Sequence, residues 1–214
     1  MTATLPSRDG PFAQGQTALL LVDMQRVWLT PGADPDHPER GPDHYFYRQT
    51  AAHTVPNAQR LLRAARENGI EVLHTIIQSL TEDGRDRSLD HKLTPIHIPP
   101  SSPDGMPIAS LSPVGDEILL PKTSSGIFNS TNIDYVLRNL GIRHLIVCGI
   151  MTDQCVDMTV RDAADRGYIV ACVSDACAAA TQERHEAALR AFGGYCWVTD
   201  TDTVVERFET MGKA

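Results

Sequence analysis

Three side chains able to carry out nucleophilic chemistry each follow a short apolar run: Asp23, Lys122 and Cys155. Cys155 opens a helical pattern six residues after Gly149, where an apolar run ends. The unpaired N–H groups and the dipole at a helix N-terminus favour negative charge, so we expect a lowered pKa for this thiol. A carboxylate can take the thiol proton and give it to a leaving amine, and an ammonium group can stabilise either anion. Together the three residues predict a site that attacks a carbonyl group.

Each of these residues also has an ordinary structural interpretation. Asp23 alone is compatible with a helix cap or a loop carboxylate, Lys122 with a solvated side chain, and Cys155 with an inert buried thiol. The other four cysteines are expected to be buried and inert: Cys148, Cys172, Cys177 and Cys196. The position of all three residues after apolar runs favours the chemical interpretation over the structural ones.

Apolar patterns typical of strands and helices alternate along the chain. We expect strands at 17–22, 70–77, 117–120, 145–148, 168–173 and 195–198, and helices at 54–68, 131–140, 155–166, 181–192 and 202–211. This alternation predicts an α/β fold in which helices cover both faces of a parallel sheet. Ligands bind beyond the carboxyl ends of the strands in such sheets, which is where the three reactive residues fall. Residues 30–53 and a Pro-rich insertion at 79–116 are expected to be irregular.

Composition excludes several classes of protein. The 214 residues fit one domain, 1–214, with its core at about 16–200. The net charge of -8 gives no attraction for nucleic acid. Five cysteines without a CxxC pair indicate a reducing compartment. Without an apolar stretch of about 18 residues or a signal-peptide core, no membrane contact and a cytoplasmic location are expected.

Three motifs resemble those of the isochorismatase-like cysteine hydrolase superfamily. They are Leu-Leu-Val-Asp-Met-Gln at 20–25, Pro-Lys-Thr-Ser-Ser-Gly-Ile-Phe at 121–128 and Gly-Ile-Met-Thr-Asp-Gln-Cys-Val at 149–156. The superfamily includes nicotinamidases, isochorismatases, and amidohydrolases of N-carbamoylsarcosine, ureidoacrylate and maleamate. The resemblance covers about residues 16–200. It implies a Rossmann-like, mostly parallel six-stranded sheet in the order 3-2-1-4-5-6.

The resemblance also implies roles for individual residues. Asp23 would be the general base, Lys122 its partner and Cys155 the nucleophile. A cis peptide bond between Ile150 and Met151 would help the N–H groups of Met151 and Cys155 to form an oxyanion hole. The thiolate would attack an amide, ureide or carbamoyl carbonyl, release ammonia or an amine, and leave a thioester for water to hydrolyse. Replacing Lys122 with alanine would then abolish turnover with little loss of folding.

Other functions remain open beside C–N hydrolysis. Some relatives cleave a vinyl ether, and an inactive binding or effector protein is a further alternative. Nicotinamidases bind a metal, for which Asp36, His37 and His74 are weak candidates, so no metal or cofactor is expected. A nucleotide-binding protein is disfavoured because G-x-G-x-x-G and P-loop motifs are missing. A redox protein is disfavoured because no resolving cysteine lies near Cys155 in the sequence. The expected partners are a small-molecule substrate and further copies of the chain, in a homodimer or homotetramer.

The residues that contact the substrate are harder to predict. Candidates that follow the reactive residues or the second strand are Gln25, Trp28, Gln78, Phe128 and Asn129. Trp28 and Phe128 could stack on a planar group, and an alternative for Gln25 is to brace a loop. The aromatic residues at 45–47 could close the site or contact a neighbouring subunit, and Met151 is larger than the alanine common in relatives. The charged segment 81–92 is expected to be a salt-bridged structural or subunit-contact loop, with Arg85 or Arg87 as an alternative partner for a substrate carboxylate.

Overall fold

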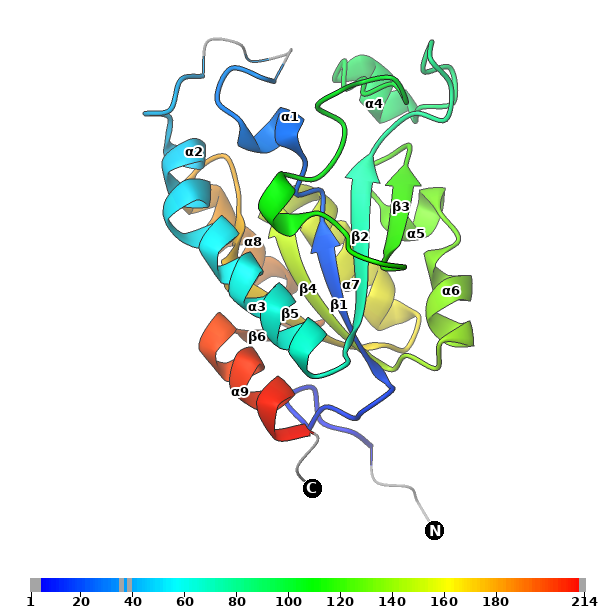
Figure 1. The fold of residues 1–214 in the computed structure, drawn as a ribbon, viewed down its shortest axis with the longest axis vertical. Helices are drawn as coiled ribbons and strands as arrows, with labels where there is room; N and C mark the ends of the chain where they lie inside the picture. Colours follow the sequence, from blue (N-terminus) through cyan, green and yellow to red (C-terminus); the bar gives the residue numbers. More distant parts are fainter. Residues whose placement is uncertain (1–4, 35–36, 38–39, 212–214) are drawn as a thin grey trace.

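The protein is built around a six-stranded sheet in which every neighbouring pair of strands is parallel (Figure 1). The computed structural model describes residues 5–34, 37 and 40–211. The sheet order is β3-β2-β1-β4-β5-β6, which confirms the predicted order and α/β class. The strands are β1 (Thr17–Val22), β2 (Glu71–Ile77), β3 (Ile118–Lys122), β4 (His144–Ile150), β5 (Ile169–Ala178) and β6 (Trp197–Thr199).

Helices cover both faces of this sheet. On one face α3 (Val55–Glu67) packs against α9 (Thr201–Met211) and against β1, β2 and β5. On the other face α7 (Asp157–Asp165) packs on β4 and β5, beside α5 (Ile127–Ser130) and α8 (Gln182–Phe192). The short α6 (Ile133–Asn139) precedes β4 and contacts α5. Because both faces are covered, the central strands β1 and β4 are buried at every position, as their continuous apolar sequences predict.

The third strand reaches two residues further than expected. Its sequence Ile-Leu-Leu-Pro-Lys ends at Lys122, rather than at Leu120. Proline lacks the N–H of a central strand, but β3 is the edge of the sheet, where proline is tolerated. As a result Lys122 is the last residue of the strand, and its side chain is fully buried.

Two segments expected to be irregular contain helices. Residues 45–53 were predicted as loop, but α2 (Tyr45–Gln49) and a π-helical turn η1 (Thr50–Thr54) run directly into α3. The His44 side chain caps α2 by accepting from the N–H of Phe46. The insertion 79–116 contains α4 (Leu89–Leu93), capped by Ser88, and a 3-10 turn η2 (Ala109–Leu111). Such short helices have too few turns to show a periodic apolar pattern. Together with α1 (Arg26–Leu29), α4 lies above the carboxyl ends of the strands (Figure 1).

Glu117 ties α3, β2 and the start of β3 together. Its carboxylate accepts two hydrogen bonds from Arg66, at 2.7 and 2.8 Å, and one from the backbone N–H of Val114. The ring of His74 lies 3.2 Å away. Burial raises the pKa of Glu117, but these hydrogen bonds outweigh it and lower the pKa from 4.5 to about 2. The folded state therefore favours the charged carboxylate.

Replacing Glu117 with glutamine is expected to lower the free energy of unfolding by about 2 kcal/mol at neutral pH, since hydrogen bonds to charged groups are lost. A lowered folded pKa gives stability that is present above 4.5 and is lost as the pH falls toward about 2. The difference between variant and wild type should therefore shrink over that range. Urea unfolding against pH measures this, with the exposed Glu209→Gln as control. An equal difference at all pH values would contradict the assigned charge.

The described helices include none that is long and apolar enough to cross a membrane.

Candidate active site

Strands β1 and β4 pair up to Val22 and Gly149, where the candidate site begins. Gly149 has a φ of +126°, and a Cβ atom there would lie 2.2 Å from the carbonyl oxygen of Val22. Only glycine fits this position. The next residue after Val22 is Asp23, whose φ of +54° is uncommon outside glycine. The close contact brings the carboxyl ends of β1 and β4 together and sets Asp23 beside the segment that carries Cys155.

Thr75 fixes the orientation of the Asp23 carboxylate. Its hydroxyl donates to Asp23 Oδ1 at 2.8 Å, and its backbone carbonyl accepts from the Asp23 N–H at 3.2 Å. Both residues are 1% exposed. Thr75 was not among the predicted site residues, although a hydroxyl side chain within the apolar run of β2 was a usable signal. Because Oδ1 is held by Thr75, Oδ2 is left for Lys122.

The ammonium group of Lys122 contacts three groups at once. Its Nζ lies 2.9 Å from Asp23 Oδ2, 3.0 Å from the carbonyl oxygen of Ser124 and 3.3 Å from Cys155 Sγ. The contacts with Ser124 and Cys155 are hydrogen bonds, and the contact with Asp23 is an ion pair. Burial disfavours the charge, but Asp23 and Cys155 outweigh that effect and raise the pKa of Lys122. The structure thus brings the three predicted residues together around one buried cation.

The thiol of Cys155 is held in its neutral form. Cys155 lies in a π-helical turn η3 (Thr152–Val156) just before α7, and it is 4% exposed. Burial raises the pKa of this thiol to about 12; Lys122 opposes the shift, while Asp23 adds to it. The expected lowering of the pKa is therefore wrong for the resting protein. Removal from water outweighs both the helix terminus and the nearby cation.

The rate of alkylation of Cys155 by iodoacetamide is expected to rise with pH throughout the range up to about pH 10, without a plateau. The reason is that the reactive thiolate forms only as the pH approaches the raised pKa of about 12. Mass spectrometry of the modified peptide would follow this site alone. A plateau at or below neutral pH would show a stable thiolate in the free protein and contradict the neutral thiol.

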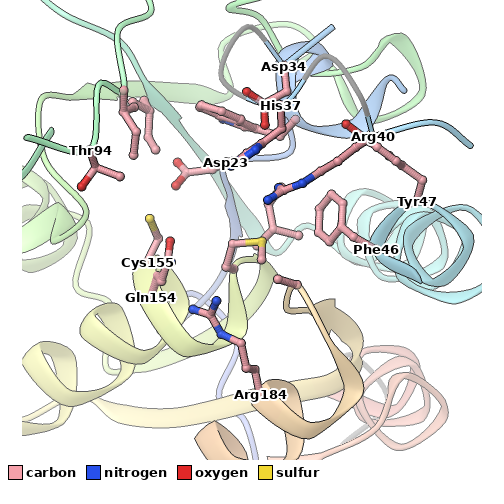
Figure 2. Close-up of a pocket in the computed structure, with 16 residues that line it drawn as sticks. Asp23, Asp34, His37, Arg40, Phe46, Tyr47, Thr94, Gln154, Cys155 and Arg184 are labelled. Carbon is pink, nitrogen blue, oxygen red and sulfur yellow. The ribbon is translucent and has the colours of Figure 1, made fainter. Parts of the chain in front are cut away.

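A cavity of about 220 Å³ opens in front of Asp23 and Cys155 (Figure 2). Its wall is mostly apolar and includes Trp28, Phe46, Tyr47, Ile77, Ile96, Ile150, Met151 and Ala180. The polar side chains on the wall are Asp34, His37, Arg40, Thr94, Gln154 and Arg184. Lys122 does not appear among the described residues that line the cavity. It lies behind Asp23 and Cys155, where it can act on both without touching a bound molecule.

The segment between β4 and Cys155 forms another part of the wall. The peptide bond between Ile150 and Met151 is cis, and both side chains line the cavity. The carbonyl oxygen of Met151 accepts from the N–H groups of Gln154 and Val156. The two candidate oxyanion donors, the N–H groups of Met151 and Cys155, belong to this segment. Their role in binding an oxyanion stays a prediction.

A comparison with known proteins identifies the family. The family model described as the isochorismatase domain matches residues 17–203. The chain belongs to the isochorismatase family. The ureidoacrylate amidohydrolase RutB of Serratia proteamaculans is 32% identical over an alignment of 226 positions, and the match covers 95% of this chain and 88% of the relative. RutB of Agrobacterium fabrum is 33% identical over 192 residues, with 81% of each chain covered.

A solved structure shows the same fold over the whole chain. It is a cysteine hydrolase from Pseudomonas syringae pv. phaseolicola, 28% identical, with a TM-score of 0.84. The match covers 99% of this chain and 100% of the other. The resemblance seen in the three motifs is therefore confirmed, and the chain is a member of a hydrolase family.

The structure places only some of the residues that were predicted to contact the substrate at the cavity of this family member. Trp28 lines it, and its Nε1 donates to the side chain of Gln25. Gln25 is fully buried and braces a loop, which was the alternative: its amide donates to the carbonyls of Ile77 and Gly105 and accepts from the Ile77 N–H. With its hydrogen bonds used inside the protein, Gln25 does not face a substrate.

The other three candidates lie elsewhere. Phe128 packs against Tyr168, under the guanidinium of Arg166, because α5 turns its apolar face toward α7. Asn129, the next residue of α5, is exposed. Gln78 is half-buried, and its backbone N–H donates to the carbonyl of Lys122. Phe128, Asn129 and Gln78 are missing from the described lining of the cavity, so the structure does not support them as substrate contacts.

Two arginines on the cavity wall were missed by the sequence analysis. Figure 2 shows the guanidinium of Arg40 directed into the cavity from the side opposite Cys155, with Arg184 of α8 below. Arg85 is ion-paired with Asp83, and Arg87 donates to carbonyl groups of its own loop, so neither faces the cavity. Both arginines of the charged segment 81–92 thus make their contacts within that segment and its loop, whereas a subunit contact stays a prediction. Arg40 and Arg184 carried no local pattern that could have marked them.

Two of the weak metal candidates, His37 and His74, lie apart from each other. His37 lines the cavity, whereas the ring of His74 in β2 contacts Glu117 and is buried away from it. Asp36 lies outside the described residues. Among those that are described, no group of three or more His, Cys, Asp or Glu side chains is arranged to hold a metal ion.

Proposed function

We propose that the protein hydrolyses a C–N bond of a small amide or ureide, with Cys155 as the nucleophile. One observation carries the proposal. A buried ammonium group lies 2.9 Å from the Asp23 carboxylate and 3.3 Å from the Cys155 sulfur, and the carboxylate and thiol face a cavity of small-molecule size. The similarity to ureidoacrylate amidohydrolases at about one third identity supports the same reaction class.

The proton begins on the sulfur and moves during the attack. Asp23 accepts the thiol proton as Sγ forms a bond to the carbonyl carbon, and the carbonyl electron pair moves onto oxygen. The N–H groups of Met151 and Cys155 then stabilise the oxyanion. When the C–N bond breaks, the leaving nitrogen takes the proton from Asp23. Lys122 stays protonated and offsets negative charge first on the carboxylate and then on the sulfur.

Water completes the cycle. Asp23, again a carboxylate, accepts a proton from a water molecule that attacks the thioester. The second tetrahedral intermediate collapses, the C–S bond breaks, and the sulfur recovers the proton. The product is a carboxylic or carbamic acid. Since Asp23 gives and takes a proton in both halves, its fixed orientation by Thr75 at 2.8 Å is part of the mechanism.

One cation on the cavity wall, Arg40, is suited to bind an acidic group of a substrate. Arg184 is ion-paired with Asp153 at 2.5 Å. Arg40 has no acidic ion-pair partner within the described part of the chain, and its guanidinium faces Cys155 across the cavity. A guanidinium group suits a carboxylate, because it can donate two parallel hydrogen bonds. We therefore assign the carboxylate of a bound amide or ureide to Arg40.

Replacing Arg40 with glutamine is expected to raise KM for a carboxylate-bearing substrate by about tenfold or more, the loss expected for a hydrogen bond to a charged group. KM for a neutral analogue of the same shape, such as the corresponding methyl ester, should change little. Steady-state kinetics with both substrates measures this, and the exposed Arg85→Gln is the matched control. Equal effects on both substrates would contradict charge recognition by Arg40.

Ammonia release from a panel of amides, ureides and carbamoyl compounds tests the proposed reaction. We expect turnover of at least one member that carries a carboxylate. If no compound releases ammonia or an amine while isochorismate is cleaved, the protein is a vinyl ether hydrolase and the proposal is wrong.

A further inference from the structure

The insertion between β2 and β3 holds the segment that follows Lys122. The backbone N–H of Ser88 donates to the carbonyl of Thr123 at 2.9 Å. Three residues later, the ring Nε2 of His91 lies 3.2 Å from the hydroxyl of Ser125. These two contacts fall on either side of Ser124, whose carbonyl accepts from the Lys122 ammonium at 3.0 Å. The Ser124 carbonyl, which is the third group in contact with the Lys122 ammonium, is therefore positioned by contacts from α4.

His91, which makes one of these contacts, is buried and not a surface residue. It is 0% exposed, and its backbone N–H donates to the Ser88 hydroxyl that caps α4. Arg87 holds the other side of the turn by donating to the carbonyl of Ile96 at 2.7 Å. The imidazole ring of His91 is therefore fully buried close to the candidate site. Figure 1 shows α4 at the carboxyl ends of β2 and β3.

We propose that His91, in its neutral form, is a positioning residue for Lys122: it fixes Ser125, and through it the Ser124 carbonyl that orients the catalytic ammonium. The role rests on the proposed cysteine chemistry and adds a residue outside the reacting groups. Misplacing the ammonium loosens its hold on both Asp23 and Cys155. We therefore expect a misplaced ammonium group to slow the chemical step, and so lower kcat, with little effect on substrate binding.

The charge state of His91 follows from its surroundings. Among the residues that the structure describes, the buried Nδ1 has no hydrogen-bond partner, so a charged ring would leave an N–H there without an acceptor. Burial lowers the pKa of His91 below 6.5; Lys122 and Arg87 lower it further, while Asp90 and Asp23 oppose them. Protonation would also place a second cation near Lys122. The neutral form therefore predominates at neutral pH, and activity should be lost as the pH falls through the lowered pKa.

The experiment compares His91→Ala, His91→Gln and the control His144→Gln. His144 is also a buried histidine with a lowered pKa and an unpartnered Nδ1, but it lies at the amino end of β4. We expect His91→Ala to lower kcat by roughly 10- to 100-fold with little change in KM. His91→Gln can still bond Ser125, so it should restore most of kcat near neutral pH and lose the wild-type decline below pH 6.5. His144→Gln should keep wild-type kcat and pH profile.

Several outcomes would overturn the role of His91. They are wild-type kcat in His91→Ala, equal loss in both His91 variants, or a wild-type acid decline in His91→Gln. If His91→Ala does not fold, the pH profile of His91→Gln decides alone. If the wild type turns over none of the C–N substrates, the proposed function fails, and the alkylation rate of Cys155 by iodoacetamide becomes the readout. It should then be slower in His91→Ala and close to wild type in His91→Gln, because a displaced Lys122 stabilises the thiolate less.

Discussion

Replacing Cys155 with serine is expected to lower kcat on the order of 10⁴-fold, the scale seen when a member of a nucleophile–base unit is removed. The side chain remains in place, but a hydroxyl is a far weaker acid than a thiol. Asp23 therefore cannot take its proton at the moment of attack. Ammonia release under saturating substrate measures the loss, and circular dichroism with thermal unfolding checks that the fold is retained.

The matched control for Cys155→Ser is Cys196→Ala. All five cysteines lie in the described part of the chain, and each is a buried free thiol. Cys196 precedes β6, and its sulfur bonds weakly to the carbonyl of Phe192, away from the cavity. Its loss should leave kcat near the wild-type value. Comparable turnover by Cys155→Ser and wild type would rule out a thioester intermediate at this residue.

Replacing Lys122 with methionine is expected to lower kcat by roughly 10³-fold and the free energy of unfolding by about 3–5 kcal/mol, because a buried charge loses its partner. The sequence alone led us to expect little loss of folding. Burial changes that expectation: Lys122 is 0% exposed and Asp23 is 1% exposed. Without the ammonium group, Asp23 must remain charged in a dry site or take up a proton. Urea unfolding and steady-state kinetics together separate the two effects.

A double variant tests whether charge causes the instability. Asp23→Asn combined with Lys122→Met removes both charges with little change in volume. Buried ion pairs can often be replaced by neutral groups without loss of stability. The double variant should therefore be more stable than Lys122→Met alone, yet remain inactive. If the two unfold at the same urea concentration, packing rather than the unpaired carboxylate accounts for the loss.

Local patterns in the sequence were enough to predict the strands and the reactive residues. The runs that form β1 and β4 are apolar at nearly every position, since helices cover both of their faces. Parallel strands bring their carboxyl ends to one edge, so Asp23, Lys122 and Cys155 could be grouped before any contact was known. The glycine at 149 was also visible as a break, although its reason is tertiary: a Cβ atom there would lie 2.2 Å from the carbonyl oxygen of Val22.

Only the tertiary structure decided which other side chains serve the site. Thr75 contacts Asp23 and His91 contacts Ser125, residues more than 30 positions away along the chain, and Arg40 faces Cys155 across the cavity. The spacing of residues along the sequence does not reveal such long-range contacts. Gln25 and Phe128 are the last residues of two of the motifs, yet neither lines the cavity, because their side chains hydrogen-bond or pack within the protein.

The sequence by itself determined that this chain carries a cysteine, a lysine and an aspartate at one edge of a parallel sheet. The protonation of that cysteine was decided only by the tertiary structure. A helix terminus and a cation favour the thiolate, whereas removal from water favours the thiol. Desolvation depends on every atom packed around the sulfur, and here it raises the pKa of Cys155 to about 12.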